Sequence, residues 1–209
     1  CNDCGKQIPP GEIIYLCPDC SAKQLPDQPP AGVLKVIYDY KNLSGLTFSE
    51  LTEKQFLQLL PVDHLTSFPN LRVGHTPLYE INALDGMLHD FELYLKDDSQ
   101  NPTFSFKDRA SALVSAFAKE NGIETIVAAS TGNAGSSLAG ICASQGQKAI
   151  IFVPATAPKA KLTQIMMYGA KLVPVAGNYD QAFDLSIEAT KHFGWYNRNT
   201  AYNPLTIEG

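Results

Sequence analysis

The 209-residue sequence has no long apolar run and no cluster of basic residues. Its longest apolar stretches, such as Ala149–Pro154, are far shorter than the ~20 residues that a transmembrane helix needs. No basic segment followed by an apolar one opens the chain, so we expect no signal peptide. The net charge is −5 and the cations are dispersed, which argues against nucleic acid because phosphate backbones attract clustered Lys and Arg. These absences predict a cytoplasmic protein with neither a membrane nor a nucleic-acid partner.

Histidine is scarce, and no internal repeat or low-complexity tract is present. The four histidines have no ligand spacing with one another or with the cysteines, so we expect them at the surface or in packing: His64, His75, His89 and His192. At 44% hydrophobic and 18% charged residues, the composition is that of an ordinary globular protein able to bury a sizeable core. Cys142 stands alone in a helical stretch of small residues and is expected to be a buried, inert thiol.

The other four cysteines lie within the first twenty residues. Cys1-x-x-Cys4 is followed after twelve residues by Cys17-x-x-Cys20, and two such knuckles can place four thiolates around one tetrahedral Zn²⁺. Two disulfides or four idle thiols are the alternatives, and disulfides are disfavoured in the cytoplasm. Lys6 is the only basic residue of this segment, so a structural zinc ribbon is favoured over one that reads nucleic acid.

The residues between the cysteines and position 122 give mixed signals. A proline-rich connection (Pro26, Pro29 and Pro30) follows the cysteines. Two segments have strand-like composition, Val33–Tyr40 and Phe91–Leu95. Capping-box spacing in Thr52–Gln55 predicts a short helix, and Ser105–Asn121 predicts a longer one that ends at Gly122.

From residue 125 the pattern becomes regular. Strands alternate with helices and the connections are short, with a glycine-containing turn at Thr131–Gly135. This order implies right-handed crossovers and a parallel sheet, hence an α/β fold. The expected strands are Thr125–Ala129, Ala149–Pro154 and Lys171–Ala176, and the expected helices are Ser136–Ser144, Pro158–Tyr168 and Tyr179–Phe193.

Lys107 is the most informative single residue. It lies in Asn101-Pro-Thr-Phe-Ser-Phe-Lys-Asp-Arg109, between a polar turn and the expected helix. The positive end of the helix dipole, and partial burial by Phe104 and Phe106, would favour the neutral amine that Schiff-base chemistry needs. The alternative is a surface lysine paired with Asp108.

Three motifs carry a resemblance to a known family. The lysine segment is similar to that of fold-type-II pyridoxal-phosphate enzymes, and Asp108 after the lysine resembles threonine synthases more than the related dehydratases. Ser130-Thr-Gly-Asn-Ala-Gly-Ser136 resembles the family loop at a helix start, and Gly74-His-Thr-Pro-Leu78 resembles a segment found ahead of the lysine. The matches run through residues 72–209.

The resemblance implies a set of roles. Lys107 would bind pyridoxal phosphate covalently, next to Phe106, and would then act as general acid and base. Asn133 would hydrogen-bond the cofactor's phenolic oxygen. The substrate carboxylate would be held by Ser130, Thr131, Asn133 and the Ala134 amide. The fold implied is a three-layer parallel α/β sheet, with a zinc ribbon and linker (1–32), the first part of a large domain (33–117), a small mobile domain (118–202) and a return segment (203–209).

Several positions depart from the family pattern. Phe104 and Ala110 replace residues that are commonly glycine, and Thr206 stands where many threonine synthases have an arginine for the substrate phosphate. The family's glycine-rich loop for the cofactor phosphate and its partner for the pyridine nitrogen are not found in these residues. We therefore expect the chain to be about half of a longer protein and to lack turnover by itself.

The reaction implied is conversion of O-phosphohomoserine and water to threonine and phosphate. Two related activities remain as alternatives, a cysteate synthase acting on O-phosphoserine and a serine or threonine dehydratase. A non-catalytic module that keeps the half-domain is the third. The resemblance also implies a homodimer for the full-length protein.

Overall fold

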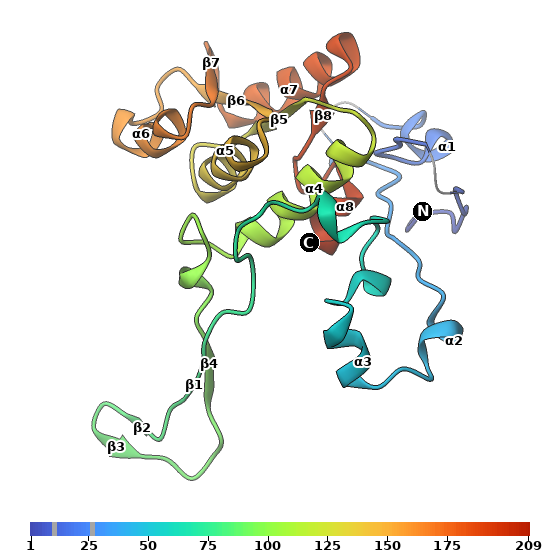
Figure 1. Ribbon diagram of the computed structural model, residues 1–209. Coiled ribbons are helices and arrows are strands. Elements are labelled where there is room, and N and C mark those ends of the chain that lie inside the picture. Colours follow the sequence, from blue (N-terminus) through green and yellow to red (C-terminus); the bar gives the residue numbers. More distant parts are fainter. Residues whose placement is uncertain (10–11, 26–27) are drawn as a thin grey trace.

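The computed structural model describes residues 1–9, 12–25 and 28–209 (Figure 1). Pro26 of the predicted linker lies outside the described residues. The centre of the fold is a four-stranded sheet of order β7-β6-β5-β8, in which every pair is parallel. Its strands are β5 (Thr125–Ala129), β6 (Lys148–Pro154), β7 (Lys171–Val175) and β8 (Tyr196–Asn197). The α/β class and the parallel sheet predicted from sequence are confirmed.

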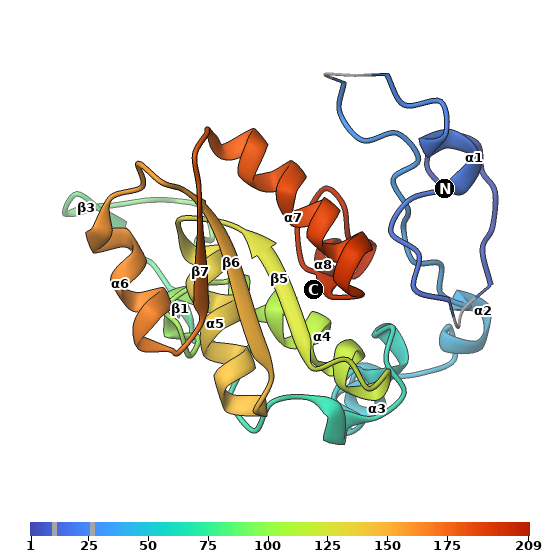
Figure 2. The ribbon, with the colours of Figure 1, turned by 90° about the horizontal axis from the view of Figure 1, so that it is seen from above.

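Helices cover both faces of this sheet and make three layers (Figure 2). Alternate residues of β5 face opposite sides: Ile126 packs with α4, α5 and α6, and Val127 packs with α7. Since both faces are buried, the strands are continuously apolar, which is the pattern that made them recognisable. The helices are α4 (Lys107–Glu120), α5 (Asn133–Gln145), α6 (Lys159–Met167), α7 (Tyr179–Phe193) and α8 (Pro204–Glu208).

The ends of these helices follow local chemistry. Gly146 and Gly194 end α5 and α7 with φ values of 69° and 68°, the left-handed conformation that glycine adopts without strain. Asn178 opens α7 with a reciprocal capping box to Gln181. The predicted elements of residues 125–193 agree with the structure to within a residue or two, except that α5 begins at Asn133, inside the predicted turn.

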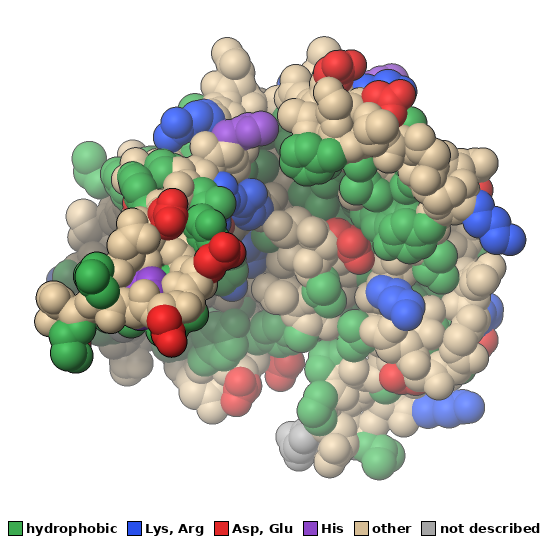
Figure 3. Space-filling model, turned by 90° about the horizontal axis from the view of Figure 1, so that it is seen from below, with side chains coloured by type: hydrophobic (Ala, Val, Ile, Leu, Met, Phe, Trp, Pro, Cys, Tyr) green, Lys and Arg blue, Asp and Glu red, His purple; other side chains and the backbone are tan. Residues whose placement is uncertain are grey.

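Residues before α4 form short elements and an extended arm. The arm is a narrow antiparallel hairpin that projects from the body of the molecule (Figure 1). Its apolar side chains are exposed, Met87 to 72% and Leu88 to 84%, and Figure 3 shows apolar side chains on the face seen from below. The elements are α1 (Pro18–Ser21), α2 (Tyr40–Leu43), α3 (Phe48–Glu53), β1 (Leu78–Glu80), β2 (Ala83–Leu84), β3 (Met87–Leu88), β4 (Tyr94–Lys96), and 3-10 turns at Leu57–Leu59, Leu65–Ser67 and Asp98–Gln100.

Two predictions for this part of the chain are wrong, and a third is shifted. Val33–Tyr40 forms no strand beyond a single bridge between Val33 and Leu16, and the Val36 N–H donates to the Glu208 carboxylate instead. The capping box that opens α3 is Thr47 with Glu50, not Thr52–Gln55, because the helix already ends at Glu53. The predicted strand Phe91–Leu95 overlaps β4.

The predicted division into domains stays a prediction. Its boundary between residues 117 and 118 falls inside α4, whose Val114 and Ala118 both pack in the core beneath the sheet. Among the described residues, no helix has both the length and the apolarity that crossing a membrane requires.

Candidate active site

The sheet order predicts that a site lies at the edge formed by the carboxyl ends of the strands. The crossovers from β5 to β6 and from β6 to β7 run through α5 and α6 on one face, whereas α7 returns the chain to β8 across the other face. The topology therefore reverses between β5 and β8. In open parallel sheets, ligands bind beyond the carboxyl ends of the strands at such a point.

A cavity of about 510 Å³ lies at this edge, within the range of cofactor and ligand sites. It brings Lys107 from the start of α4 together with Thr131, Asn133 and Ala134 from the turn after β5. Four further lining residues had no role assigned from the sequence: Gly132 and Ser136 of the same motif, and Ala160 and Gln164. The last two come from α6, whose sequence carries no signal for a site.

Two expected site residues do not line this cavity. The Ser130 hydroxyl accepts a hydrogen bond from the Gly132 N–H at 3.2 Å and so stabilises the turn itself. Phe106 instead lies against the lysine, with Lys107 Nζ 4.2 Å from the ring centroid, a cation–π contact. Phe106 and Phe104 are 56% and 74% exposed, so both residues lie largely at the surface.

The start of α5 presents backbone N–H groups to the cavity. The Gly135 and Ser136 N–H groups bond to Gly132 O, at 2.9 and 3.1 Å. In the described residues, no hydrogen bond uses the N–H of Thr131, Asn133 or Ala134. Unpaired amides at the positive end of a helix form a binding place for an anion such as a carboxylate.

Gly135 allows the turn to sit closely on α5. A Cβ at this position would lie 2.8 Å from Ser130 O and 2.9 Å from Ile165 Cδ1, and the first of these is backbone. We expect Gly135→Ala to lower the free energy of unfolding by about 1–3 kcal/mol, although alanine is the better helix former. Gly132→Ala is the matched control, since a Cβ there meets nothing within 4 Å. Urea unfolding of both variants tests this, and equal stability would contradict it.

Asp108 does not pair with Lys107. Its carboxylate is fully buried and accepts hydrogen bonds from the Thr103 N–H at 2.7 Å and the Thr103 hydroxyl at 2.6 Å. The alternative of a surface Lys107–Asp108 pair is therefore wrong. The aspartate instead closes the loop from Thr103 to the start of α4, while Lys107 remains available to the cavity.

Ala110 and Phe104, which replace residues that are commonly glycine in the family, differ in packing and in backbone conformation. Ala110 is buried on α4 against Gly209, where an added Cβ would lie 2.5 Å from Ala110 Cα. Phe104 has φ of 64°, a left-handed conformation that is strained for any residue with a Cβ.

The strain at Phe104 can be measured by comparing two truncations. Phe104→Gly and Phe104→Ala both remove the exposed ring, but only glycine removes the Cβ. We expect the glycine variant to be more stable than the alanine variant by about 1 kcal/mol. Thermal or urea unfolding measures the difference, and an alanine variant at least as stable would show that the left-handed conformation is not retained in solution.

Arg198 lies directly after β8, at the same edge of the sheet, and was not anticipated. It is 1% exposed, its Nε donates to Ser111 Oγ at 3.4 Å, and Nη2 has no partner among the described residues. Burial lowers the pKa of this guanidinium to about 10. Thr206, at the position where the family commonly has arginine, donates its hydroxyl to Arg198 O at 3.0 Å. The only sequence signal was the polar triplet Asn197–Asn199 after an apolar segment.

The four amino-terminal cysteines converge. Their Sγ atoms all lie within 4.8 Å of one another, and the Cys1–Cys20 and Cys4–Cys17 pairs are each 3.8 Å apart. All are free thiols, so the disulfide alternative is wrong. Four sulfurs at about 2.3 Å from a tetrahedral Zn²⁺ would be about 3.8 Å apart, so the cluster fits this ion.

Cys142 takes no part in this cluster. It is fully buried on α5, as predicted, and burial raises the pKa of its thiol to about 12. A thiol that stays protonated at neutral pH is a poor nucleophile and a poor ligand.

Comparisons with known proteins show which family this chain is similar to. The family model for pyridoxal-phosphate dependent enzymes matches residues 70–209. Threonine synthases of Methanocaldococcus jannaschii and Methanosarcina acetivorans are 38% and 32% identical over the whole chain, and the chain spans about half the length of each. Among solved structures, an O-ureido-L-serine synthase is similar with TM-score 0.54 and 28% identity, over 60% of this chain and 41% of that one. A pyridoxal 5'-phosphate-dependent aspartate racemase has TM-score 0.56 and 26% identity, over 66% and 44%.

Proposed function

Because this chain belongs to the pyridoxal-phosphate dependent enzyme family, we propose that the protein carrying it is a threonine synthase, a lyase that acts on the carbon–oxygen bond of a phosphate ester. The substrates would be O-phosphohomoserine and water, and the products threonine and phosphate. The named relatives support this choice. The observation that carries it is the cavity where Lys107 faces the start of α5.

The residues present fit the cofactor. The cavity has suitable size, a lysine amine within it, and an adjacent helix start for an anionic group. Lys107 would hold the cofactor covalently, and the Asn133 side chain would bond its phenolic oxygen. When bound, pyridoxal phosphate withdraws electrons from the substrate's α-carbon.

Lys107 and the start of α5 would have different roles in the reaction. Lys107 is the only lysine that lines the cavity in the described part of the chain, so its amine would take the α-proton and return protons later. Thr131 and the N–H groups of Asn133 and Ala134 would hold the substrate carboxylate. Fixing the carboxylate fixes the α-carbon relative to Nζ, which is the main requirement for efficient proton transfer.

Three further proposals concern the whole protein. The four cysteines would hold one Zn²⁺, with a structural role because Lys6 is the only basic residue among residues 1–20. The protein would act in the cytoplasm on a small phosphorylated amino acid and would not bind nucleic acid. It would be a homodimer at full length.

Substrate profiling of the full-length protein tests the reaction, with phosphate and ammonia followed separately. Release of phosphate and threonine from O-phosphohomoserine is the expected result. Phosphate release from O-phosphoserine alone would indicate a cysteate synthase. Ammonia release from serine or threonine without phosphate would indicate a dehydratase. No turnover of any of these would leave a non-catalytic module.

A further inference from the structure

Asp98 links three segments that are separate in sequence. It lies in the turn after β4, with its side chain 26% exposed. Arg109, in the first turn of α4, donates to it through both Nε and Nη2, at 2.9 and 2.8 Å. The Thr76 hydroxyl donates to the same carboxylate at 2.6 Å. Two parallel N–H···O bonds to one carboxylate are the most directional ion-pair geometry available to arginine.

Neighbouring contacts close the network around this pair. Arg109 Nη2 also lies 3.4 Å from the Thr76 hydroxyl, and Lys96 Nζ donates to Thr76 O. Asn101 accepts the Gly74 N–H at 2.8 Å and donates to Asp98 O at 2.9 Å. A Cβ at Gly74 would lie 3.0 Å from Arg109 Nη1, so the segment at 74–76 sits directly on the guanidinium.

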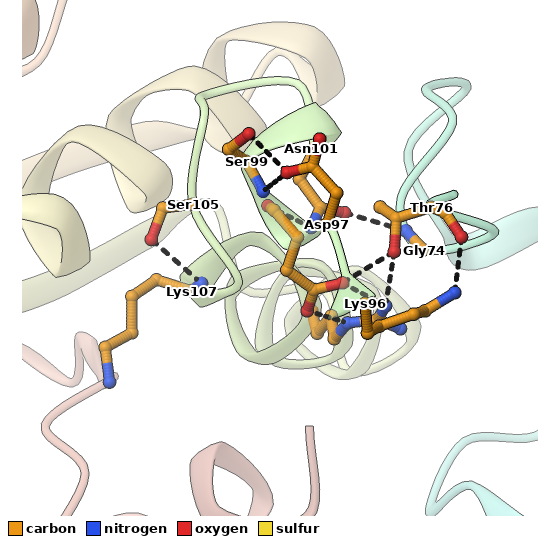
Figure 4. A network of polar contacts seen from close by, with 10 residues as sticks. Gly74, Thr76, Lys96, Asp97, Ser99, Asn101, Ser105 and Lys107 are labelled. Carbon is orange, nitrogen blue, oxygen red and sulfur yellow. Dashed lines mark hydrogen bonds and ion pairs between the residues drawn. The ribbon is translucent and has the colours of Figure 1, made fainter. Parts of the chain in front are cut away.

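The ion pair acts on the side of α4 opposite to the cavity. Residues two apart on a helix differ by about 200° in direction, so Arg109 and Lys107 project to opposite sides of the first turn. Figure 4 shows the Lys107 side chain directed away from Thr76 and Asn101. Lys107 itself lines the cavity with Asn133. The network therefore holds the first turn of α4 on the side opposite to Lys107.

Ala110 packs the first turn of α4 against Gly209, but few polar contacts link this turn to the segments before it. Its N-cap residue Phe106 makes no side-chain capping bond, and the Lys107 N–H reaches Ser105 Oγ at 3.2 Å. Asp108 ties the turn to Thr103 within the same loop, not to another segment. In the described residues, the Asp98–Arg109 pair is the ion pair that joins this turn to the chain before it.

We propose that Asp98 is a positioning residue for Lys107: through Arg109 it fixes the rotation of the first turn of α4, so that the amine faces the Asn133 loop. The proposal deepens the proposed function and rests on it for the role of Lys107. Arg109 and Thr76 hold the pKa of Asp98 down at about 2. A lowered carboxylate pKa means that the pair is intact above about pH 4 and is lost only as the pH falls toward 2.

Asp97 supplies a matched control. It is the neighbouring residue in the same turn, and its carboxylate accepts hydrogen bonds only from that turn in the described residues, from Ser99 and Gln100. Asp97→Asn and Asp98→Asn therefore make the same chemical change one residue apart, and only the second cuts the link to α4.

The first test follows covalent attachment at pH 7 in the full-length protein. Pyridoxal phosphate is added, borohydride traps the product, and mass spectrometry counts modification at Lys107. We expect Asp98→Asn to slow attachment by about 10- to 100-fold, because small displacements of a reacting group have effects of this order. Asp97→Asn should stay within about twofold, and Asp98→Glu should restore part of the rate. Equal rates for the two asparagine variants would overturn the proposal.

The second test needs no cofactor. Hydrogen exchange of the Lys107–Arg109 amides should accelerate by about tenfold or more in Asp98→Asn, while amides of the sheet are unchanged. If Asp98→Asn unfolds, Arg109→Lys replaces it, since lysine keeps the charge but loses the paired bonds. Unchanged exchange in this turn would refute the positioning role. If the wild-type protein shows no attachment at Lys107 but exchange responds as expected, the proposed function fails and the link from Asp98 to α4 stands.

Discussion

Replacing Lys107 by alanine is expected to abolish covalent attachment of pyridoxal phosphate and to reduce turnover of the full-length protein on the order of 10³-fold or more. General acid–base catalysis alone accounts for about 10²–10⁴-fold in enzymes, and this residue would also anchor the cofactor. Lys107 is the lysine that lines the cavity together with Asn133 in the described residues. Absorbance of the bound cofactor, borohydride trapping and phosphate release measure the loss.

Lys171→Ala is the control for this experiment. Lys171 is exposed at the start of β7 and does not line the cavity, so its loss should leave both attachment and turnover unchanged. The stability of Lys107→Ala should match that of the wild type, since within the described residues Lys107 bonds to its surroundings only through its backbone and one cation–π contact. An alanine variant that still binds the cofactor covalently and releases threonine would remove the proposed function.

Replacing Cys17 by serine is expected to release the metal from the amino-terminal cluster and to unfold this segment locally. Purified wild-type protein should contain one zinc per chain under reducing conditions. Structural zinc contributes about 10–16 kcal/mol of apparent binding free energy in isolated small domains, so the loss of one thiolate should have a large effect on this segment. Cys17 is the fully buried member of the four, and its N–H donates to Gly32 O at 2.8 Å.

Metal analysis and limited proteolysis read out this effect. Cys142→Ser is the control and should keep full zinc, because Cys142 lies in the core of the α/β sheet. The ligands are thiolates, so acidification should release zinc as protons compete for sulfur. Wild-type protein without stoichiometric zinc, or a Cys17→Ser variant that retains it, would refute the metal site.

The regular half of the fold was predictable because its signals are local. Strands buried on both faces must be apolar along their whole length, and the helices between them end at glycines with positive φ, such as Gly146 and Gly194. The region before α4 was less predictable. Val33–Tyr40 has strand composition, yet a strand also needs a partner, and the Val36 N–H bonds to a side chain 172 positions away.

Some residues of the site were likewise predictable from the sequence, and others were not. Lys107 and Asn133 were predicted because each lies in a short motif that resembles one of a known family, and both line the same cavity in the structure. Asp98 and Gln164 carried no signal, and Arg198 carried only the weak one of the polar triplet Asn197–Asn199. An aspartate in a polar turn and a glutamine on a helix are common on any surface, and nothing local shows which residues they meet.

The sequence by itself determined the order of strands and helices from residue 125 onward, the two cysteine pairs and the lysine motif, since each depends on residues close together in the chain. Only the tertiary structure decided that the arm is an antiparallel hairpin, that Asp108 faces Thr103 and not the lysine, and that Asp98 and Arg109 hold the start of α4. The physical reason is that ion pairs and hydrogen bonds between distant segments require donor–acceptor distances correct to a few tenths of an ångström and suitable angles. This geometry exists only once the segments have packed.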